Sequence, residues 1–274
     1  MSILAISTAF NPDIDLMKKS IASFINYVDK LLIWRNSIIN EEALTDGFDN
    51  SKIEFCGDCD NVGIPKALNY AWHYAESFGY SHLLTMDQDS VFDSFPSYID
   101  AVLSPEAPEG FFGPLINKHQ SINPVQPVYS YCPFIITSGL FISIPLIRKI
   151  GGWDEDFFVD GVDMEFVFHA LELGILSYHV NNVTLIHRLG NTETKSFLWK
   201  NYTTNNYSPE RLYNLYKSHI IIIRKYKSAK ALRKVFRVQN YWQRPLRILL
   251  GEKDKFKKLG AAIKGIIDGR RYPL

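Results

Sequence analysis

The sequence has few cysteines and no long apolar run. It holds three cysteines in 274 residues, which excludes a small disulfide-stapled scaffold and fits a reducing compartment. No apolar stretch reaches the roughly 18 residues that a membrane-spanning helix needs. The opening residues, MSILAISTAF, carry no basic segment ahead of an apolar run, so no signal peptide is indicated. Gly-rich loops of the P-loop or Rossmann type are also absent. We therefore expect a cytoplasmic protein.

Acidic residues are scarce in the C-terminal part of the chain, although the whole chain is nearly neutral at +1. Residues 224–274 contain 16 Lys and Arg against three acidic residues, and the other 223 residues have an excess of 12 acids. A basic segment on an acidic body favours an anionic partner, such as an anionic membrane surface. A solvated helical face, or packing of the basic segment on the acidic body, is the alternative.

The first half of the chain alternates apolar strands with amphipathic helices. Strands are expected at residues 3–7, 31–34, 53–56 and 82–86, and helices over 16–28 and 65–78. This alternation predicts an α/β fold with a Rossmann-like, mostly parallel sheet flanked by helices. Ligands of such sheets bind at the carboxyl ends of the strands, where Thr8, Asn36 and Asp87 fall.

The second half is less regular. We expect a loop over 117–133, a strand region over 135–143, a helix from Pro145 to Gly151, a helix over 162–173 and two strands within 175–187. A polar stretch then leads to a helical tail broken at Pro245 and Gly251. The change to a basic, helical composition near Asn205 predicts two domains, residues 1–205 and a basic helical C-terminal extension, residues 206–274.

Two acidic groups of residues indicate a site. Asp87-Gln88-Asp89 directly follows an apolar strand, which suits a hard divalent cation shared with substrate phosphates; a capped turn is the alternative. The segment GGWDEDFFVDGVDMEF places five further carboxylates among aromatic residues before and within a helix. Asp160 or Asp163 could be the helix cap, but a cap accounts for one or two acids only.

The order of these motifs resembles glycosyltransferase family 2, and within it bacterial rhamnosyltransferase-like members. The resemblance rests on the segments Thr8–Pro12, Trp34–Ser37, Asn61–Asn69, Asp87–Asp89, Thr137–Gly139, GGWDEDFFVDGVDMEF, Leu185–Gly190 and Ile263–Gly269. It covers nearly the whole chain and implies a GT-A fold.

The resemblance also implies an activity. It implies an inverting, metal-dependent transfer of a hexosyl or deoxyhexosyl group from a nucleoside-diphosphate sugar to a hydroxyl of a glycan or lipid-linked saccharide, in surface polysaccharide synthesis. Asp163 would be the general base, and Asp89 would hold Mg²⁺ or Mn²⁺, with His187 as a candidate further ligand. A histidine that is simply packed in its strand is the alternative for His187. The residues implied for the donor pocket are Thr8, Phe10, Asn36, Asn61, Lys66 and Asp87.

Three residues depart from the family's pattern. Val162 stands where the family usually has an acid, His169 replaces the usual arginine, and Arg35 replaces an acid that reads the base. Two other classes of function compete with a glycosyltransferase. A nucleotidyltransferase would need a Gly- and Arg-rich loop after the first strand, where this chain has Thr8–Pro12. A nucleic-acid-binding protein would use the basic tail, but the acidic body disfavours it, so we expect no nucleic-acid partner.

Overall fold

The computed structural model describes residues 1–117, 127–187, 193–197 and 200–274. These residues form two compact units, of which the first ends at Arg188 and the second begins at Leu189.

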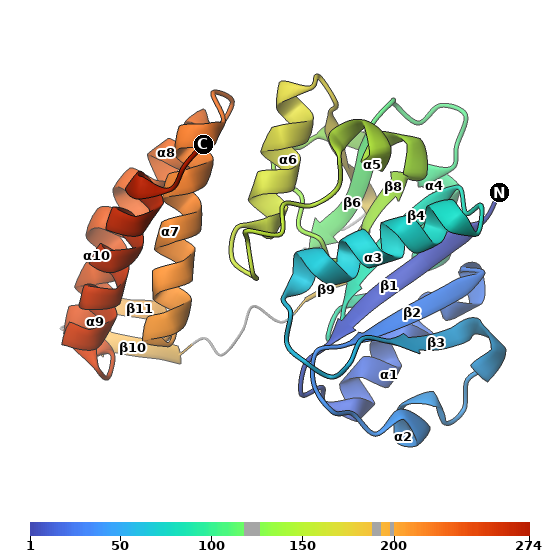
Figure 1. The fold of residues 1–274 in the computed structure, drawn as a ribbon, viewed down its shortest axis with the longest axis horizontal. Coiled ribbons are helices and arrows are strands. Elements are labelled where there is room, and N and C mark those ends of the chain that lie inside the picture. Colours follow the sequence, from blue (N-terminus) through green and yellow to red (C-terminus); the bar gives the residue numbers. More distant parts are fainter. Residues whose placement is uncertain (118–126, 188–192, 198–199) are drawn as a thin grey trace. The chain divides into compact units, whose positions relative to one another are not determined.

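A nine-stranded sheet forms the centre of the first unit (Figure 1). The strands lie in the order β3-β2-β1-β4-β8-β6-β9-β5, and β7 pairs with β9. The four strands β3, β2, β1 and β4 run parallel, whereas β8 is antiparallel to β4. In chain order they are β1 (Ile3–Ala9), β2 (Lys30–Arg35), β3 (Ile53–Cys56), β4 (His82–Asp87), β5 (Val91–Phe92), β6 (Phe111–Ile116), β7 (Tyr129–Tyr131), β8 (Leu140–Ser143) and β9 (Ser177–Ile186).

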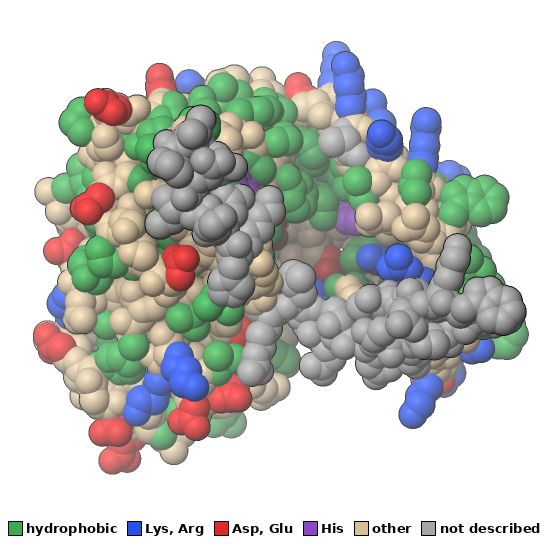
Figure 2. Space-filling model, turned by 180° about the vertical axis from the view of Figure 1, so that it is seen from behind, with side chains coloured by type: hydrophobic (Ala, Val, Ile, Leu, Met, Phe, Trp, Pro, Cys, Tyr) green, Lys and Arg blue, Asp and Glu red, His purple; other side chains and the backbone are tan. Residues whose placement is uncertain are grey.

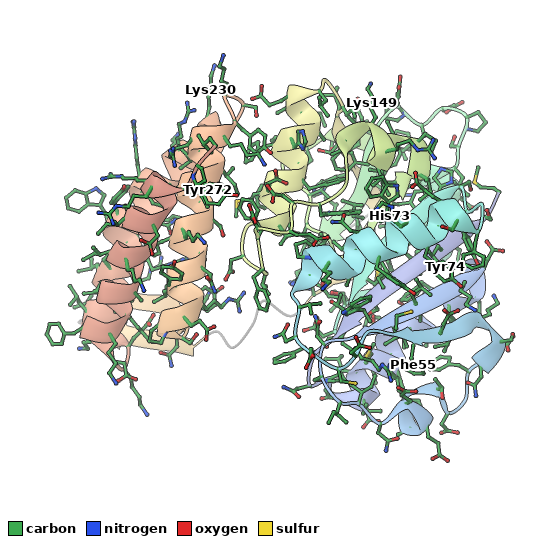
Figure 3. The ribbon with its side chains drawn as sticks, in the orientation of Figure 1. Phe55, His73, Tyr74, Lys149, Lys230 and Tyr272 are labelled. Atoms are coloured by element: carbon green, nitrogen blue, oxygen red, sulfur yellow. The ribbon has the colours of Figure 1, made fainter. Side chains whose placement is uncertain are left out.

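Helices cover both faces of this sheet, which is why its strands are apolar on both sides. Ile3, Ala5 and Ala9 of β1 pack in one core with α1 (Ile14–Ala22), α2 (Glu41–Thr45) and α4 (Phe95–Val102). The other face carries α3 (Ile64–Ser77), with α5 (Ile144–Ile150) and α6 (Val162–Glu172) beside it (Figure 1). Tyr74 of α3 donates a hydrogen bond to Glu54 of β3 at 3.0 Å (Figure 3). The α/β class with flanking helices is confirmed.

Several elements differ from the sequence expectations in the first unit. The helix expected over 16–28 ends at Ala22 as α1, and α2 and β6 were not expected. The two strands expected within 175–187 are one strand, β9, whose register against β6 shifts between Pro114 and Leu115. This irregularity interrupts the apolar pattern, so the sequence of this single strand predicts two strands. The expected loop over 117–133 contains the short strand β7, and its residues 118–126 lie outside the described residues. The strand region expected over 135–143 is ordered as a strand only in β8.

The second unit is helical apart from one hairpin. It holds β10 (Glu193–Phe197) and β11 (Lys200–Thr204), then α7 (Pro209–Lys225), α8 (Lys230–Val235), the π-helix η3 (Phe236–Gln243), α9 (Arg244–Gly251) and α10 (Lys255–Arg271). Its core contains Leu212 and Tyr216 of α7, Phe236 and Ile248. A Cβ on Gly265 of α10 would lie 2.4 Å from the carbonyl oxygen of Tyr213, so glycine permits the close packing of α10 on α7.

Pro245 does not break the tail helix, contrary to expectation. Helical backbone runs from Lys230 to Gly251, with a π-helical stretch immediately before Pro245. Proline has no N–H to donate to the carbonyl four residues earlier, and a wider turn at that point accommodates the ring without ending the helix. The expected end at Gly251 is present.

The hairpin of β10 and β11 lies before the expected domain boundary near Asn205, yet it groups with the second unit. The Thr204 hydroxyl donates a hydrogen bond to the buried carboxylate of Glu252, which also pairs with Lys258 at 2.7 Å. These buried bonds connect the end of the hairpin to the loop between α9 and α10. Among the described residues, no helix is long and apolar enough to cross a bilayer.

Candidate functional site

The carboxyl ends of β1, β2 and β4 are joined by side-chain bonds. Thr8 of β1 lies beside Trp34 of β2 and Asp87 of β4 in the sheet register. Gln88 accepts a hydrogen bond from the Phe10 amide at 2.7 Å and donates one to the Phe10 carbonyl at 3.2 Å. The Asn11 amide donates to the Ser37 hydroxyl at 2.7 Å. The first loop is therefore fixed to both neighbouring strand ends, while the Phe10 side chain remains half exposed.

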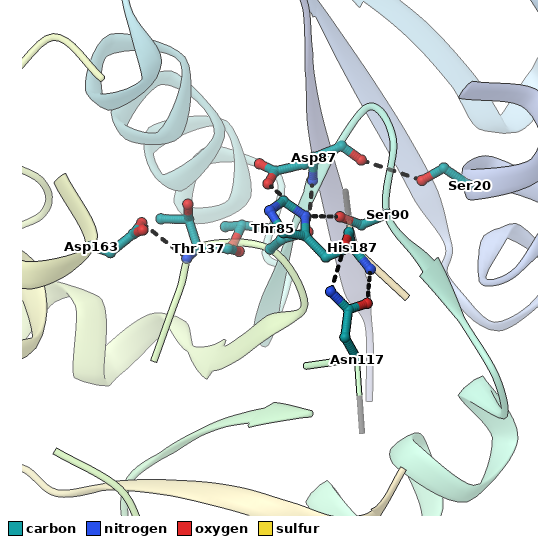
Figure 4. A network of polar contacts seen from close by, with 9 residues as sticks. Ser20, Thr85, Asp87, Ser90, Asn117, Thr137, Asp163 and His187 are labelled. Atoms are coloured by element: carbon teal, nitrogen blue, oxygen red, sulfur yellow. Dashed lines mark hydrogen bonds and ion pairs between the residues drawn. The ribbon is translucent and has the colours of Figure 1, made fainter. Parts of the chain in front are cut away.

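Asp87, Asp89 and His187 form a candidate cation site. Their ligand atoms all lie within 4.8 Å of one another. Asp87 ends β4, Asp89 lies two residues further along, and His187 directly follows β9. His187 Nδ1 is 3.6 Å from Asp87 Oδ2 (Figure 4). Two carboxylates and one imidazole are a donor set for Mn²⁺ or Mg²⁺ together with substrate oxygens.

Two neighbours hold His187 in place. Its Nδ1 lies 2.7 Å from the Ser90 hydroxyl. Its backbone exchanges two hydrogen bonds with the side-chain amide of Asn117, which follows β6. When Nδ1 carries the proton and donates to Ser90, the lone pair of Nε2 remains available for a ligand. The ring is thus oriented by residues from two other strand ends.

The electrostatics of the site favour a cation. Burial, together with the nearby charges of Asp163 and Asp89, raises the pKa of Asp87 to about 7, although a hydrogen bond with Ser138 opposes the rise. Carboxylates crowded in this way repel one another unless a proton or a cation offsets their charge. A divalent cation between Asp87 and Asp89 would relieve this repulsion.

Asp163 is held beside the cluster by the segment that contains Thr137, Ser138 and Gly139. Its Oδ1 accepts a hydrogen bond from the Thr137 amide at 3.0 Å, and Ser138 Oγ accepts one from the Asp87 amide at 3.2 Å (Figure 4). The Thr85 hydroxyl donates to the Thr137 carbonyl. Neighbouring residues of one segment therefore bond to the Asp163 carboxylate and to the backbone of Asp87. Burial raises the pKa of Asp163, although the bonds to Thr137 oppose the rise.

Asp163 is not a helix cap. The N-cap residue of α6 is Gly161, in left-handed backbone conformation with φ of 99°, and it makes no side-chain capping bond. The Asp163 carboxylate lies in the first turn and bonds to Thr137 instead. The N-cap position of this helix is therefore Gly161, and neither Asp160 nor Asp163.

The residues implied for the donor pocket differ in what their side chains do. Asn36 is buried: its Oδ1 accepts from Trp34 Nε1 and the Val62 amide, and its Nδ2 donates to the Gly63 carbonyl. It therefore holds the turn that leads into α3. Asn61 is exposed and accepts a bond from the Gly63 amide at 3.3 Å, and Lys66 is exposed in the first turn of α3.

Arg35 and Val162, which depart from the pattern of glycosyltransferase family 2, have structural roles in this fold. Arg35 pairs with Glu41 at 2.6 Å and donates to the carbonyls of Cys56 and Gly57, so its guanidinium braces the ends of β2 and β3. Val162 is buried at the start of α6.

The acidic loop before α6 is anchored to α3 by Asn69. Its Nδ2 donates to the Trp153 carbonyl at 2.8 Å and to Glu155 at 2.9 Å, and its Oδ1 accepts from the Trp153 amide at 2.9 Å. The Ile64 amide also donates to the Phe158 carbonyl. Both ends of the turn 153–158, which leads toward Asp163, are thus hydrogen-bonded to α3.

Comparisons with solved structures identify the fold. The chain aligns with GalNAc-T7, solved with UDP, GalNAc and Mn²⁺, at a TM-score of 0.63 and 12% identity, over 99% of this chain and 56% of that one. It aligns with residues 1–349 of TarS from S. aureus, in complex with UDP-GlcNAc, at 0.57 and 12% identity, over 97% of this chain and 82% of that one. This is the GT-A glycosyltransferase fold. The GT-A fold that the sequence resemblance implies is confirmed.

The chain is also similar to part of a curated relative. The dTDP-rhamnosyl transferase RfbF of Shigella flexneri is 25% identical over 183 residues, which cover 60% of this chain and 61% of the relative. The chain thus matches about three fifths of that relative's length. No family model matches the sequence.

Sequence reasoning missed several residues that build the site. It named Asp87, Asp89 and His187, and the structure brings these three together. It considered Ser90 only as a residue that caps the turn, and it gave no role to Gln88 or Asn117; these three hold the loop and the histidine. Gln88 lies inside the Asp-Gln-Asp motif, so the motif itself was the available signal, whereas Asn117 is 70 residues from His187 and carried none.

Proposed function

We propose that this GT-A chain is a family 2 glycosyltransferase that moves a hexosyl or deoxyhexosyl group, rhamnose-like, from a nucleoside-diphosphate sugar to a hydroxyl of a glycan or lipid-linked saccharide. The observation that carries the proposal is the cluster of Asp87, Asp89 and His187 beside Asp163 at the carboxyl end of the sheet. Two similarities support it: the curated relative is named a dTDP-rhamnosyl transferase, and the structural neighbours bind UDP or UDP-GlcNAc.

The donor set fits Mg²⁺ or Mn²⁺. Asp89 and His187, with Asp87 beside them, would hold the ion; burial and the neighbouring carboxylates raise the pKa of Asp87. When bound, the ion supplies Lewis-acid stabilisation to the departing diphosphate. Thr8, Phe10, Asn61 and Lys66 would line the nucleotide and diphosphate, with the Lys66 ammonium at the N-terminal turn of α3, while Asn36 positions the adjoining turn.

Asp163 is the proposed general base for a single inverting displacement. The acceptor hydroxyl forms a bond to the anomeric carbon as the bond to the diphosphate breaks, and the hydroxyl proton passes to the Asp163 carboxylate. A positioned base typically contributes about 10²–10⁴ in rate. The Thr137 amide fixes one oxygen of the carboxylate at 3.0 Å, which leaves the other oxygen for the proton.

We further propose that the acceptor is bound to a membrane, that an anionic membrane surface is a partner, and that the process is surface polysaccharide synthesis. The surface of the second unit supports this. Figure 2 shows Lys and Arg side chains projecting from this unit with hydrophobic side chains between them. Trp242 is 77% exposed and Phe256 is 86% exposed. Basic residues beside exposed aromatic residues suit the headgroup region of a bilayer. We place the protein in the cytoplasm, on the inner face of the membrane.

Ligand-induced stabilisation tests the donor site. Thermal unfolding is measured with UDP, dTDP or GDP, each with and without Mn²⁺ or Mg²⁺. We expect at least one diphosphate to raise Tm when the cation is present. Asp89→Asn should lose this effect, whereas the matched variant Asp100→Asn, at an exposed position of α4, should keep it. Equal stabilisation in EDTA would refute the metal role, and no stabilisation by any diphosphate would refute the donor site.

A further inference from the structure

A small pocket in the second unit is lined by two arginines. The pocket has a volume of about 50 Å³, and its walls include Asn205, Asn206, Tyr207, Arg244, Arg247 and Glu252. It lies between the end of β11, the start of α7 and the helix α9. A water molecule needs roughly 10–15 Å³ of such space, so the pocket holds a group several times larger.

Arg244 has an unused hydrogen-bonding group at this pocket. Its Nη1 atom is buried and has no hydrogen-bond partner among the described residues. A buried guanidinium nitrogen without a partner is costly, and the planar donors of arginine match the oxygens of a phosphate. The guanidinium carbon lies 5.6 Å from the centre of the Tyr207 ring, which limits the orientations available to the side chain.

The one carboxylate in the lining is already neutralised by other residues. Glu252 is 7% exposed; it accepts a hydrogen bond from Thr204 and pairs with the buried Lys258 at 2.7 Å. Lys258 also donates to Asn206 at 2.6 Å. Because Glu252 already bonds to Thr204 and Lys258, its charge does not neutralise Arg244 and Arg247. The positive charge of these two arginines can therefore attract an anion.

We propose that this pocket binds a phosphate group, as carried by an anionic lipid headgroup or by a soluble phosphate ester. Arg244 supplies the buried donor, and the exposed Arg247 adds a second guanidinium to the lining, which also contains Asn205. The pocket belongs to the second unit alone, so the proposal does not depend on the transfer reaction or on the donor site.

Binding of inorganic phosphate and of glycerol phosphate to the full-length protein tests the proposal, measured by titration calorimetry. We expect Arg244→Gln and Arg247→Gln to weaken binding about tenfold or more, because each removes a charge-assisted hydrogen bond. Arg270→Gln, which removes the same charge at an exposed position near the end of α10, should change it less than about twofold. Circular dichroism shows whether each variant is folded, and Arg247 is exposed, so its variant should fold.

Vesicles separate the two sources of phosphate. One set contains phosphatidylcholine with phosphatidic acid, and the other replaces phosphatidic acid by oleate, an anion without phosphate. Arginine-dependent binding to the first set alone assigns a lipid headgroup, and arginine-dependent binding of free phosphate without vesicle preference assigns a soluble ester. Unchanged binding in both pocket variants, or an equal loss in Arg270→Gln, would overturn the proposal.

Discussion

At the scale of single residues, the site depends on two acidic residues, Asp163 and Asp87, to which one short segment bonds. Asp163 bonds to the amide of Thr137, and the amide of Asp87 bonds to the hydroxyl of Ser138. Both acids have raised pKa values because they are buried, and for Asp87 the charge of Asp163 adds to the effect. A raised pKa makes a carboxylate a better proton acceptor, which suits the role proposed for Asp163.

Asp163→Asn should abolish most turnover without loss of structure. The asparagine oxygen can still accept the Thr137 bond, but the amide cannot take a proton at neutral pH. We expect a loss of about 10²–10⁴ in kcat with unchanged stabilisation by nucleoside diphosphate. Asp156→Asn, in the exposed part of the loop, is the matched control. Near-normal kcat in Asp163→Asn would move the base to another acid of the segment, with Asp160 the first candidate.

At the scale of elements, helix-to-loop contacts decide where the acidic segment lies. Asn69 projects from α3 and makes three hydrogen bonds to the turn that begins at Trp153. Gly152 precedes this turn with φ of 80°, and a Cβ there would lie 2.7 Å from Asn69 and Trp72. The helix and the loop therefore fix each other.

Asn69→Ala should destabilise the first unit. It leaves the Trp153 amide without its partner, and unsatisfied buried groups cost about 1–3 kcal/mol each. Urea unfolding measures the loss, and limited proteolysis shows whether cleavage begins within 152–160. Asn182→Ala, at an exposed position of β9, should change the free energy of unfolding by less than about 0.5 kcal/mol. A stable Asn69→Ala variant would mean that the loop is held mainly by its aromatic residues.

A buried histidine in α7 makes the second unit acid-sensitive. His219 is 7% exposed and lies 2.9 Å from the Asn240 side chain. Burial, with a smaller contribution from the charge of Arg244, lowers its pKa to about 3. The unfolded chain therefore binds a proton at a pH where the folded chain does not, so stability is lost as the pH falls below about 6.5.

The loss should amount to about 1.4 kcal/mol per pH unit between about pH 6.5 and 3. Urea unfolding of the wild type should show that His219 lowers the free energy of unfolding by about 2 kcal/mol between pH 7 and pH 5. The His219→Gln variant should lack this contribution to the pH dependence. His73→Gln, whose side chain is 64% exposed in the wild type, should retain the acid sensitivity. An unchanged pH dependence in His219→Gln would show that His219 is not the group responsible.

At the scale of the whole molecule, basic charge is concentrated in the second unit. Residues 224–274 carry 16 of the 30 basic residues, and the helices α8 to α10 expose several large apolar side chains while packing others against α7. Deleting this segment would uncover Leu212 and Tyr216 of the core. Surface substitutions therefore test membrane binding better than truncation does.

The full-length protein should bind vesicles that contain anionic lipid, and high salt should weaken the binding because the lysines and arginines act through screened charge. The double variant Trp242→Ala with Leu246→Ala should bind less tightly, since these side chains are 77% and 56% exposed. Ile38→Ala with Phe78→Ala removes comparable exposed apolar area from the first unit and should have no effect. Vesicle co-sedimentation measures all three, and no binding at low salt would refute the membrane role.

The sequence by itself determined the first four strands, β1 to β4, and the helix α3. The strand expected at 53–56 and the helix expected over 65–78 match β3 and α3 to within a residue, because periodicity and Pro65 are local signals. It also pointed to Asp87 and Asp89, since the Asp-Gln-Asp motif begins at the last residue of β4.

Only the tertiary structure decided which of these residues meet. Asp89 and His187 are about 100 residues apart in the sequence and come together because β4 and β9 end at the same edge of the sheet. Their supports, Ser90, Asn117 and the segment at Thr137, come from separate strand ends. The bent strand β9, the hairpin at 193–204 and the unbroken helix through Pro245 were likewise settled by long-range pairing and packing, because local patterns carry no information about the partner that satisfies them.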